Sequence, residues 1–180
     1  MRIIAGEFGS RKINSLKSRV SRPTSDKVRA AIFDHLGSYF DEGTFLDLFS
    51  GTGAMALEAL SRGYEKAVMV EVDRKAAAMI QENIHNFDVK NRSDVKVMDV
   101  PTYLKRSLEV FDCIFLDPPY DYKDIDKVVA TIASLEILKE KGYCIVETDR
   151  NVHLRDGYGN LSRYRSKTYG NTTIHYYQRT

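Results

Sequence analysis

The sequence contains few cysteine and histidine residues that could form disulfide bonds or metal sites. Only two cysteines occur among its 180 residues, Cys113 and Cys144, and each lies within an apolar run. Such positions suit small core residues of a chain in a reducing cytosol, so we predict no structural disulfide. The four histidines are scattered and the cysteines are far apart, so we also predict no metal site.

Long apolar stretches are missing as well. No uninterrupted run approaches the ~20 residues of a membrane-spanning helix, and residues 1–7 lack the apolar centre of a secretion signal. Hydrophobic residues make up 43% of the chain and charged residues 29%, values typical of a globular protein. We therefore expect a folded cytoplasmic protein of one domain, with at most a short extension.

The net charge is only +2, but it is unevenly distributed along the chain. Residues 1–29 carry +6 and residues 150–180 carry +5, whereas the segment between them carries −9. Two basic ends around an acidic centre indicate contact with a polyanion, and five tyrosines in the last segment could stack on bases. The pattern equally fits two solvated ends that cover an edge of the core, so charge alone leaves both interpretations open.

Short apolar strands alternate with helices through most of the chain. The near-continuous apolar strands suit a parallel sheet covered by helices on both faces. A basic N-terminal hairpin and a helix that starts at Thr24 or Ser25 precede this sheet, and an antiparallel hairpin around Gly170 and Asn171 closes it. The predicted strands are residues 45–49, 67–72, 95–99, 111–116 and 143–147, and the predicted helices between them are residues 55–63, 74–87, 102–108 and 125–138.

Unusual residues follow four of these strands. They are the segment 47–53 after the first strand, Glu71 after the second, Asp99 after the third and the segment 117–120 after the fourth. Ligands of parallel α/β sheets bind outside the carboxyl ends of the strands, near the point where the strand order reverses. All four features are therefore expected on one rim of the sheet.

The first feature is a glycine loop between a strand and a helix. Gly51-Thr-Gly53-Ala-Met-Ala56 has the G-x-G-x-x-A pattern, whose glycines allow a tight turn and a close backbone approach to a ligand. Glu71 at the next strand end can bind ribose hydroxyls. This pair also fits a dinucleotide enzyme, but Asp47 would face the anionic pyrophosphate unfavourably.

A positively charged nucleoside fits the acidic residues better. S-adenosylmethionine carries a ribose, an adenine, an ammonium and a sulfonium, and it has no phosphate. We predict Asp47 near its amino-acid end, Glu71 on its ribose and Asp99 on its adenine amine; for Asp99, an N-cap before Pro101 is an equally good interpretation. The predicted donor-binding set is completed by Ser50, Gly51, Thr52, Gly53, Val72, Val100 and Asp117.

The corner Asp117-Pro118-Pro119-Tyr120 follows a buried apolar strand. Two prolines fix φ and remove two backbone donors, which leaves a stiff corner rich in acceptors. Asp117 and the Pro118 carbonyl can accept both protons of one planar amino group, while Tyr120 stacks on its ring. Such a grip aims the nitrogen lone pair at a methyl donor, so we predict these four residues as catalytic. The alternative is a rigid turn with a capping aspartate.

Together these motifs resemble the RsmD family, the bacterial 16S rRNA guanine-N2 methyltransferases, within the class I methyltransferases that use S-adenosylmethionine. The resemblance spans nearly the whole chain and implies a Rossmann-like, mostly parallel sheet of seven strands with helices on both faces. It implies an N-terminal extension in residues 1–40 and a methyltransferase domain in residues 41–180. The matching segments are Arg2–Gly6, Arg22–Arg29, Asp47–Gly53, Leu57–Gly63, Asp117–Tyr120 and Tyr177–Arg179.

The resemblance also implies a target, one guanine of the small-subunit head near the P site, and therefore a partner, 16S rRNA or an assembling 30S subunit. We expect a monomer. Whether Arg22 touches the donor or an RNA phosphate stays open. The residues predicted to bind RNA are Arg11, Lys12, Arg19, Arg22, Thr24, Arg163, Arg165 and Lys167.

Three rival functions are weighed against this one. Relatives with the same corner methylate adenine N6, cytosine N4 or a glutamine side chain, but 180 residues leave no room for the separate target-recognition domain of a DNA adenine methyltransferase. A non-catalytic RNA-binding protein would not need the intact rim. A nicotinamide oxidoreductase is disfavoured by Asp47 and by the corner at Asp117.

Overall fold

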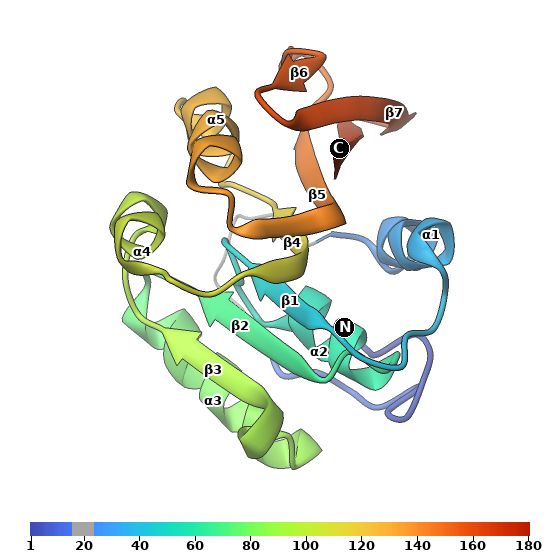
Figure 1. Ribbon diagram of the computed structural model, residues 1–180. Coiled ribbons are helices and arrows are strands. Elements are labelled where there is room, and N and C mark those ends of the chain that lie inside the picture. The colour runs from blue at the N-terminus through green and yellow to red at the C-terminus, as the bar shows by residue number, and fades with distance from the viewer. Residues whose placement is uncertain (16–23) are drawn as a thin grey trace.

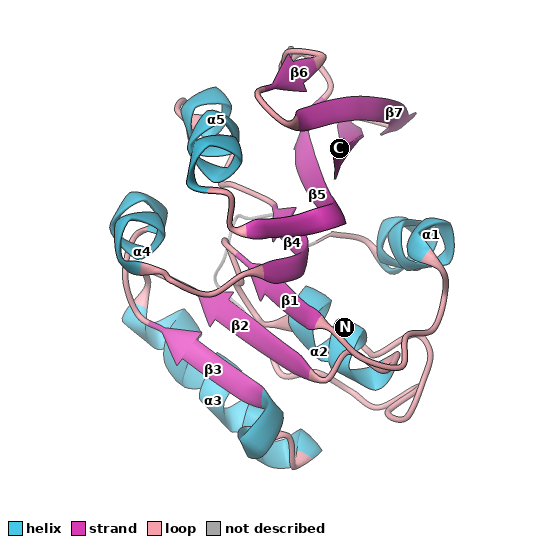
Figure 2. Ribbon diagram, in the orientation of Figure 1, coloured by secondary structure: helices cyan, strands magenta, loops and turns pink. Residues whose placement is uncertain are grey.

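The computed structural model describes residues 1–15 and 24–180, which build a three-layer α/β structure around one sheet (Figures 1 and 2). The strands of that sheet are β1 (Thr44–Asp47), β2 (Lys66–Val70), β3 (Ser93–Lys96), β4 (Phe111–Leu116), β5 (Leu138–Asp149), β6 (Gly157–Tyr158), β7 (Leu161–Tyr169) and β8 (Thr172–Arg179). The helices are α1 (Asp26–Leu36), α2 (Ala54–Ser61), α3 (Arg74–Phe87), α4 (Val100–Arg106) and α5 (Ile125–Leu135), with a 3₁₀ turn at Lys90–Arg92.

The strand order is β3-β2-β1-β4-β5-β8-β7-β6. The first five of these strands pair in parallel, and β8, β7 and β6 continue the sheet in antiparallel fashion. The predicted alternation of strands and helices and the closing hairpin of β7 and β8 are confirmed. Because β4 pairs with β1, the strand order reverses direction between them, and a ligand site is expected there.

The sheet has eight strands and not the seven implied by the family resemblance. The additional strand, Gly157–Tyr158, is two residues long and pairs only with the start of β7 at Leu161 and Ser162. Two residues cannot show the alternation of apolar and polar positions by which a strand is found in a sequence. The helix predicted for residues 125–138 also ends earlier, at Leu135, because Glu136 adopts a left-handed conformation with φ of 54°.

Two apolar clusters cover the two faces of the sheet. One joins the N-terminal segment, α1, α2 and α3 to the sheet, and the other joins α4 and α5 to its opposite face. Both cysteines are buried and unpaired, as expected for small core residues. Among the residues that the structure describes, no helix is long and apolar enough to cross a bilayer.

Residues 1–15 form a strap over α2 rather than a regular hairpin. The predicted pairing is reduced to one antiparallel bridge between Arg2 and Lys12. Gly6 turns the strap against α2: its φ is +86°, and a side chain there would come within 1.9 Å of the Ser61 carbonyl oxygen. Ile3 is fully buried in the same core as the helices, so this segment and the sheet share one packing unit.

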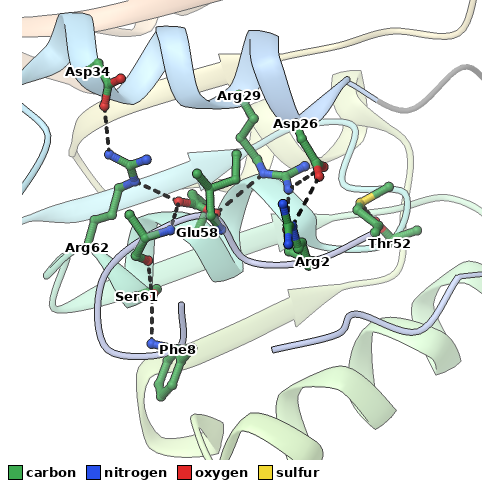
Figure 3. Close-up of polar contacts among 12 residues, drawn as sticks. Arg2, Phe8, Asp26, Arg29, Asp34, Thr52, Glu58, Ser61 and Arg62 are labelled. Carbon is green, nitrogen blue, oxygen red and sulfur yellow. Dashed lines mark hydrogen bonds and ion pairs between the residues drawn. The ribbon is translucent and has the colours of Figure 1, made fainter. Parts of the chain in front are cut away.

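A buried carboxylate fastens the strap to the helices (Figure 3). Glu58 of α2 accepts hydrogen bonds from the backbone N–H groups of Ile4 at 2.8 Å and Ala5 at 3.1 Å. The same carboxylate pairs with Arg62 at 2.7 Å and lies 3.5 Å from the Arg29 guanidinium of α1. Since all three side chains are almost fully buried, removing one would leave its partners as uncompensated charges, and the network therefore holds α1 in place.

Candidate functional site

The carboxyl ends of β2, β1, β4 and β5 form the rim on which the sequence motifs meet. Asp47 ends β1 and is paired with Met69 of β2 and Phe115 of β4. Glu71 therefore lies beside the glycine loop on one side of Asp47, and Asp117 lies on the other side. The fourth predicted strand, β4, lies beside the first, β1, and this strand order alone brings the glycine loop next to the proline corner.

The glycine loop runs from β1 into α2 as a tight turn. Gly51 and Gly53 have φ of 57° and 80°, a region that residues with side chains rarely adopt. The Gly53 N–H donates to the Ser50 carbonyl at 2.7 Å, and the Ser50 hydroxyl donates to the Asp47 carbonyl at 2.9 Å. No side chain caps α2 at Gly53, so the amino end of the helix is left to a ligand or to water.

Glu71 connects the end of β2 to this loop. Its side chain accepts hydrogen bonds from the N–H of Gly51 at 2.8 Å and the N–H of Asp73 at 2.9 Å. These two hydrogen bonds orient the Glu71 carboxylate beside the glycine loop, where it was predicted to bind the ribose. Asp73 in turn caps α3 through the Ala76 N–H at 2.8 Å.

Asp47 is the most deeply buried acid of the rim, with 1% of its surface exposed. Burial raises the pKa of Asp47 to about 7, and the negative charge of Glu71 adds to that effect. Among the described residues, its Oδ1 atom has no hydrogen-bond partner. A buried acceptor without a donor costs free energy, and a cationic ligand group such as an ammonium would satisfy it. The residues present therefore fit the amino-acid end of S-adenosylmethionine.

Asp99 is the N-cap of α4, which is the alternative role that the sequence predicted for it. Its carboxylate accepts hydrogen bonds from the Thr102 N–H and the Thr102 hydroxyl, both at 2.8 Å, and these bonds lower its pKa. The side chain is exposed at the rim, and contact with adenine stays a prediction. Of its apolar neighbours in the predicted set, Val100 is buried and Val72 is 67% exposed, so Val72 has surface for a ligand to cover.

The proline corner leaves β4 with its aspartate turned inward and its tyrosine outward. Asp117 and Pro118 are partly buried, Pro119 is exposed and Tyr120 is 92% exposed. The Tyr122 N–H donates to the Pro119 carbonyl at 2.9 Å and closes the turn. The exposed ring of Tyr120 is accessible to a planar base, as its predicted stacking role requires.

Two residues without a predicted role in this corner lie against Asp117. The Thr24 hydroxyl is 2.7 Å from Oε2 of Glu147, at the end of β5, and 3.2 Å from Oδ2 of Asp117. Burial raises the pKa of Asp117 well above its ordinary value, and the negative charges of Glu147 and Asp47 raise it further. Thr24 was predicted to bind RNA; the structure places its side chain against Asp117 and Glu147, and the residue is 8% exposed.

A sequence signal for Glu147 exists, although it is weaker than the motifs. Glu147 is the acidic end of an apolar strand, as Asp47 is, but no glycine or proline follows it to mark a special turn. Among the described residues, no group of three His, Cys, Asp or Glu side chains is arranged to hold a metal ion.

The predicted RNA contacts lie in two separate places. Arg165 and Lys167 are exposed on β7, and Arg163 is paired there with Asp156. Arg11 lies over the Phe87 ring, 4.4 Å from its centroid, at the C-terminal end of α3. Because α3 runs antiparallel to the strands, that end is opposite the rim. Lys12 is exposed on the strap, and Arg19 and Arg22 lie outside the described residues.

The open α/β sheet, the glycine loop and the acidic rim define a methyltransferase of the class that uses S-adenosylmethionine. The chain belongs to the family described as Conserved hypothetical protein 95, whose model matches residues 1–178.

Relatives and solved structures match this chain over most of their length. The YlbH protein of Bacillus subtilis is 35% identical over 99% of both chains. The Ribosomal RNA small subunit methyltransferase D of Haemophilus influenzae is 30% identical over 99% of this chain and 93% of its own. A solved structure, a conserved hypothetical protein of Streptococcus pyogenes, is 38% identical with a TM-score of 0.81 and covers 85% of this chain and 96% of its own.

Proposed function

We propose that this methyltransferase transfers a methyl group from S-adenosylmethionine to the exocyclic N2 amine of a guanine in 16S rRNA. The observation that carries the proposal is that the acceptor corner at Asp117 lies on the strand beside Asp47, whose Oδ1 atom has no partner among the described residues. The name of the Haemophilus influenzae relative supports small-subunit rRNA as the substrate. The family resemblance of the motifs supports guanine N2 as the target amine.

The donor half of the site consists of Asp47, Glu71, the glycine loop and the predicted apolar contacts Val72 and Val100. S-adenosylmethionine supplies a methyl group on a positively charged sulfur. The acidic rim favours such a ligand over a phosphate-bearing one, since Asp47 would repel a pyrophosphate. Asp47 would hold its ammonium and Glu71 its ribose, with Asp99 near the adenine.

The target half consists of the corner and its two acceptors. Asp117 and the Pro118 carbonyl accept the two protons of the target amine, and Tyr120 stacks on the base after it has left its own stack. This grip turns the nitrogen lone pair toward the methyl group. A nitrogen–carbon bond forms while the carbon–sulfur bond breaks, and the positive charge that develops on nitrogen is stabilised by Asp117 until a proton leaves.

The RNA surface continues from the corner along the sheet. Glu147 pairs with Ile174 of β8, and Ile174 pairs with Lys167 of β7, so the three side chains point to the same face. Two such strand pairings span roughly 10 Å, about three nucleotide spacings of a stacked strand, and this proximity supports an RNA contact of Lys167 close to the corner. Lys167 also lies 5.1 Å from the centroid of the Tyr169 ring, a neighbouring surface on which a base could stack.

The same proposal includes the assembling or assembled 30S subunit as the working partner, a monomeric enzyme and a cytoplasmic location. The test is methyl transfer from labelled donor to 30S particles, naked 16S rRNA and double-stranded DNA, followed by nucleoside analysis. We expect N2-methylguanosine in an RNA substrate. N6-methyladenosine would redirect the proposal to the adenine methyltransferases, and label in none of the substrates would contradict it.

A further inference from the structure

Thr24 lies between two carboxylates and has only one hydroxyl proton to offer. Its Oγ1 atom is 2.7 Å from Oε2 of Glu147 and 3.2 Å from Oδ2 of Asp117. Both distances are hydrogen-bond distances, but one hydroxyl can donate to only one of them. Both contacts are satisfied together if a second proton resides on one of the carboxyl groups, so that the hydroxyl accepts from one and donates to the other.

The surroundings favour such a shared proton. Glu147 and Thr24 are each 8% exposed, and Asp47, whose charge acts on Asp117, is 1% exposed with an unpartnered Oδ1. Carboxyl groups that share one hydroxyl within hydrogen-bond distance interact, so their protonation is coupled. The shorter contact, to Glu147, is the one to which the hydroxyl donates, which leaves Asp117 as the carboxyl that donates to Thr24.

We propose that Thr24 and Glu147 are positioning residues for Asp117, and that the Thr24 hydroxyl relays one proton between the two carboxyl groups. The inference rests on the proposed function and adds two residues to its target half. In the resting site the proton is on Oδ2 of Asp117, which orients the carboxyl group and presents Oδ1 to the target amine.

The relay matters when charge develops on the target nitrogen. The proton on Asp117 then passes to Thr24 Oγ1 while the hydroxyl proton of Thr24 passes to Glu147, so that Asp117 becomes the negative partner of the positive nitrogen. An N–H bond of the methylated amine breaks and an O–H bond forms on Asp117, which leaves a neutral secondary amine. The additional proton is released to water when the product leaves.

The first test compares Thr24→Val, which removes the hydroxyl at nearly constant volume, with Thr24→Ser, which keeps it. The rate is measured in a single turnover at saturating donor and RNA, together with donor affinity and the melting temperature. We expect Thr24→Val to be slower on the order of 10- to 100-fold with unchanged donor affinity, because the acceptor is no longer held in place. Thr24→Ser should stay within about threefold of the wild type, since the relay is retained.

Thr148→Val is the matched control. Thr148 is buried to a similar degree, is next to Glu147 in the chain, and its hydroxyl is hydrogen-bonded to Nε2 of His175 at 3.0 Å, away from the corner. A loss that came merely from removing a buried hydroxyl near this strand would appear in that variant as well. A folded Thr24→Val enzyme with a single-turnover rate within about twofold of the wild type would overturn the inference, since one relay step then contributes little.

The second test is a double-mutant cycle of Thr24→Val with Glu147→Gln. If Thr24→Val fails to fold, Glu147→Gln alone is measured in the same single-turnover assay, and a slower rate at unchanged donor affinity is expected, whereas a rate within about twofold of the wild type would overturn the inference. If the two residues act through one relay, the double variant should be no slower than the slower single variant. Losses that multiply would show independent roles and contradict the relay. Failure of the proposed function is distinguishable, because the wild type itself would then not methylate guanine N2; if it methylates another amine, the same cycle is run on that substrate.

Discussion

The donor half and the target half of the rim are held together in different ways. In the donor half, Glu71 accepts backbone N–H groups from residues 20 and 2 positions away in the chain. In the target half, Thr24 joins Asp117 and Glu147 across 93 and 123 residues, entirely through side chains. The donor half is therefore a local structure of one β-α-β unit, whereas the target half depends on the packing of α1 against β4 and β5.

This difference predicts how the two halves respond to substitution. Backbone N–H donors stay in place when a side chain is substituted, so the glycine loop should persist in donor-half variants. Each such substitution should lower donor affinity only by the contacts that it removes. The side chains of the target half orient one another, so the loss of one should disturb the others and act on turnover. The N-terminal region is held to α2 by the buried Glu58 network, and it supplies Thr24 to the proposed target half.

The largest effect is expected for Asp117→Asn. The amide keeps the shape of the side chain but carries no negative charge to stabilise the developing positive charge. The rate constant kcat should fall on the order of 10²–10³-fold with little change in donor affinity. Asp121→Asn, an exposed neighbour in the same turn, serves as the control in single-turnover methylation and melting curves. A folded variant with near wild-type turnover would reduce the corner to a rigid turn.

Glu71→Ala should act on the other half. Losing charge-assisted hydrogen bonds to the ribose and to the loop should weaken donor binding by roughly 1–3 kcal/mol, measured by calorimetry. Glu82→Ala removes the same charge from the exposed face of α3 and should leave the affinity unchanged. Unaltered donor affinity in Glu71→Ala would remove this residue from the donor site.

Tyr120 separates ring stacking from hydroxyl chemistry. Tyr120→Ala loses a stacking surface worth roughly 1–3 kcal/mol per base, so the KM for RNA should rise and kcat/KM should fall. Tyr120→Phe keeps the ring and should be mild. Equal losses in both variants would point to the hydroxyl instead. Tyr39→Ala, at another exposed tyrosine, controls for a general loss of aromatic surface.

Donor affinity should depend on pH through Asp47. The pKa of Asp47 is raised by burial to about 7, so the group is protonated in most molecules below that pH and cannot pair with an ammonium. Affinity should rise by up to about tenfold per pH unit between pH 5 and 7, and fall again above about pH 8 as the ammonium of the ligand is lost. Asp47→Asn should flatten the lower limb, and a profile identical to that of the wild type would exclude Asp47.

The smallest effect is expected for Arg165 and Lys167, the two exposed basic residues of β7. Arg165→Gln with Lys167→Gln should reduce the dependence of RNA affinity on salt by roughly 0.7 in slope per lost contact on single-stranded RNA. Lys105→Gln with Arg106→Gln removes the same charge at the far end of α4 and should change the slope less. Arg11→Gln with Lys12→Gln tests the strap, where Arg11 lies away from the rim. An unchanged slope in the β7 variant would leave that edge without an RNA contact.

Features that depend on consecutive residues were predictable from the sequence alone. The glycine loop, Glu71 and the proline corner each follow an apolar strand, and the carboxyl ends of parallel strands meet on one rim whatever the details of packing. The bounds of α3 agree with the prediction because Asp73 caps one end and a residue with positive φ, Asp88, ends the other. These signals are local, and local chemistry suffices to produce them.

Features that depend on which strands become neighbours were decided by the tertiary structure. No residue pattern near Glu147 predicts that β5 lies beside β4. Nor does the sequence predict that the hydroxyl of Thr24, which precedes α1, reaches the ends of both strands. Arg11 and Thr24 are both N-terminal and were both predicted to bind RNA, yet Arg11 lies at the C-terminal end of α3 and Thr24 lies against Asp117. Contacts between side chains a hundred residues apart have no period or spacing in the chain, because they arise only when the strand order and the helix packing bring them together.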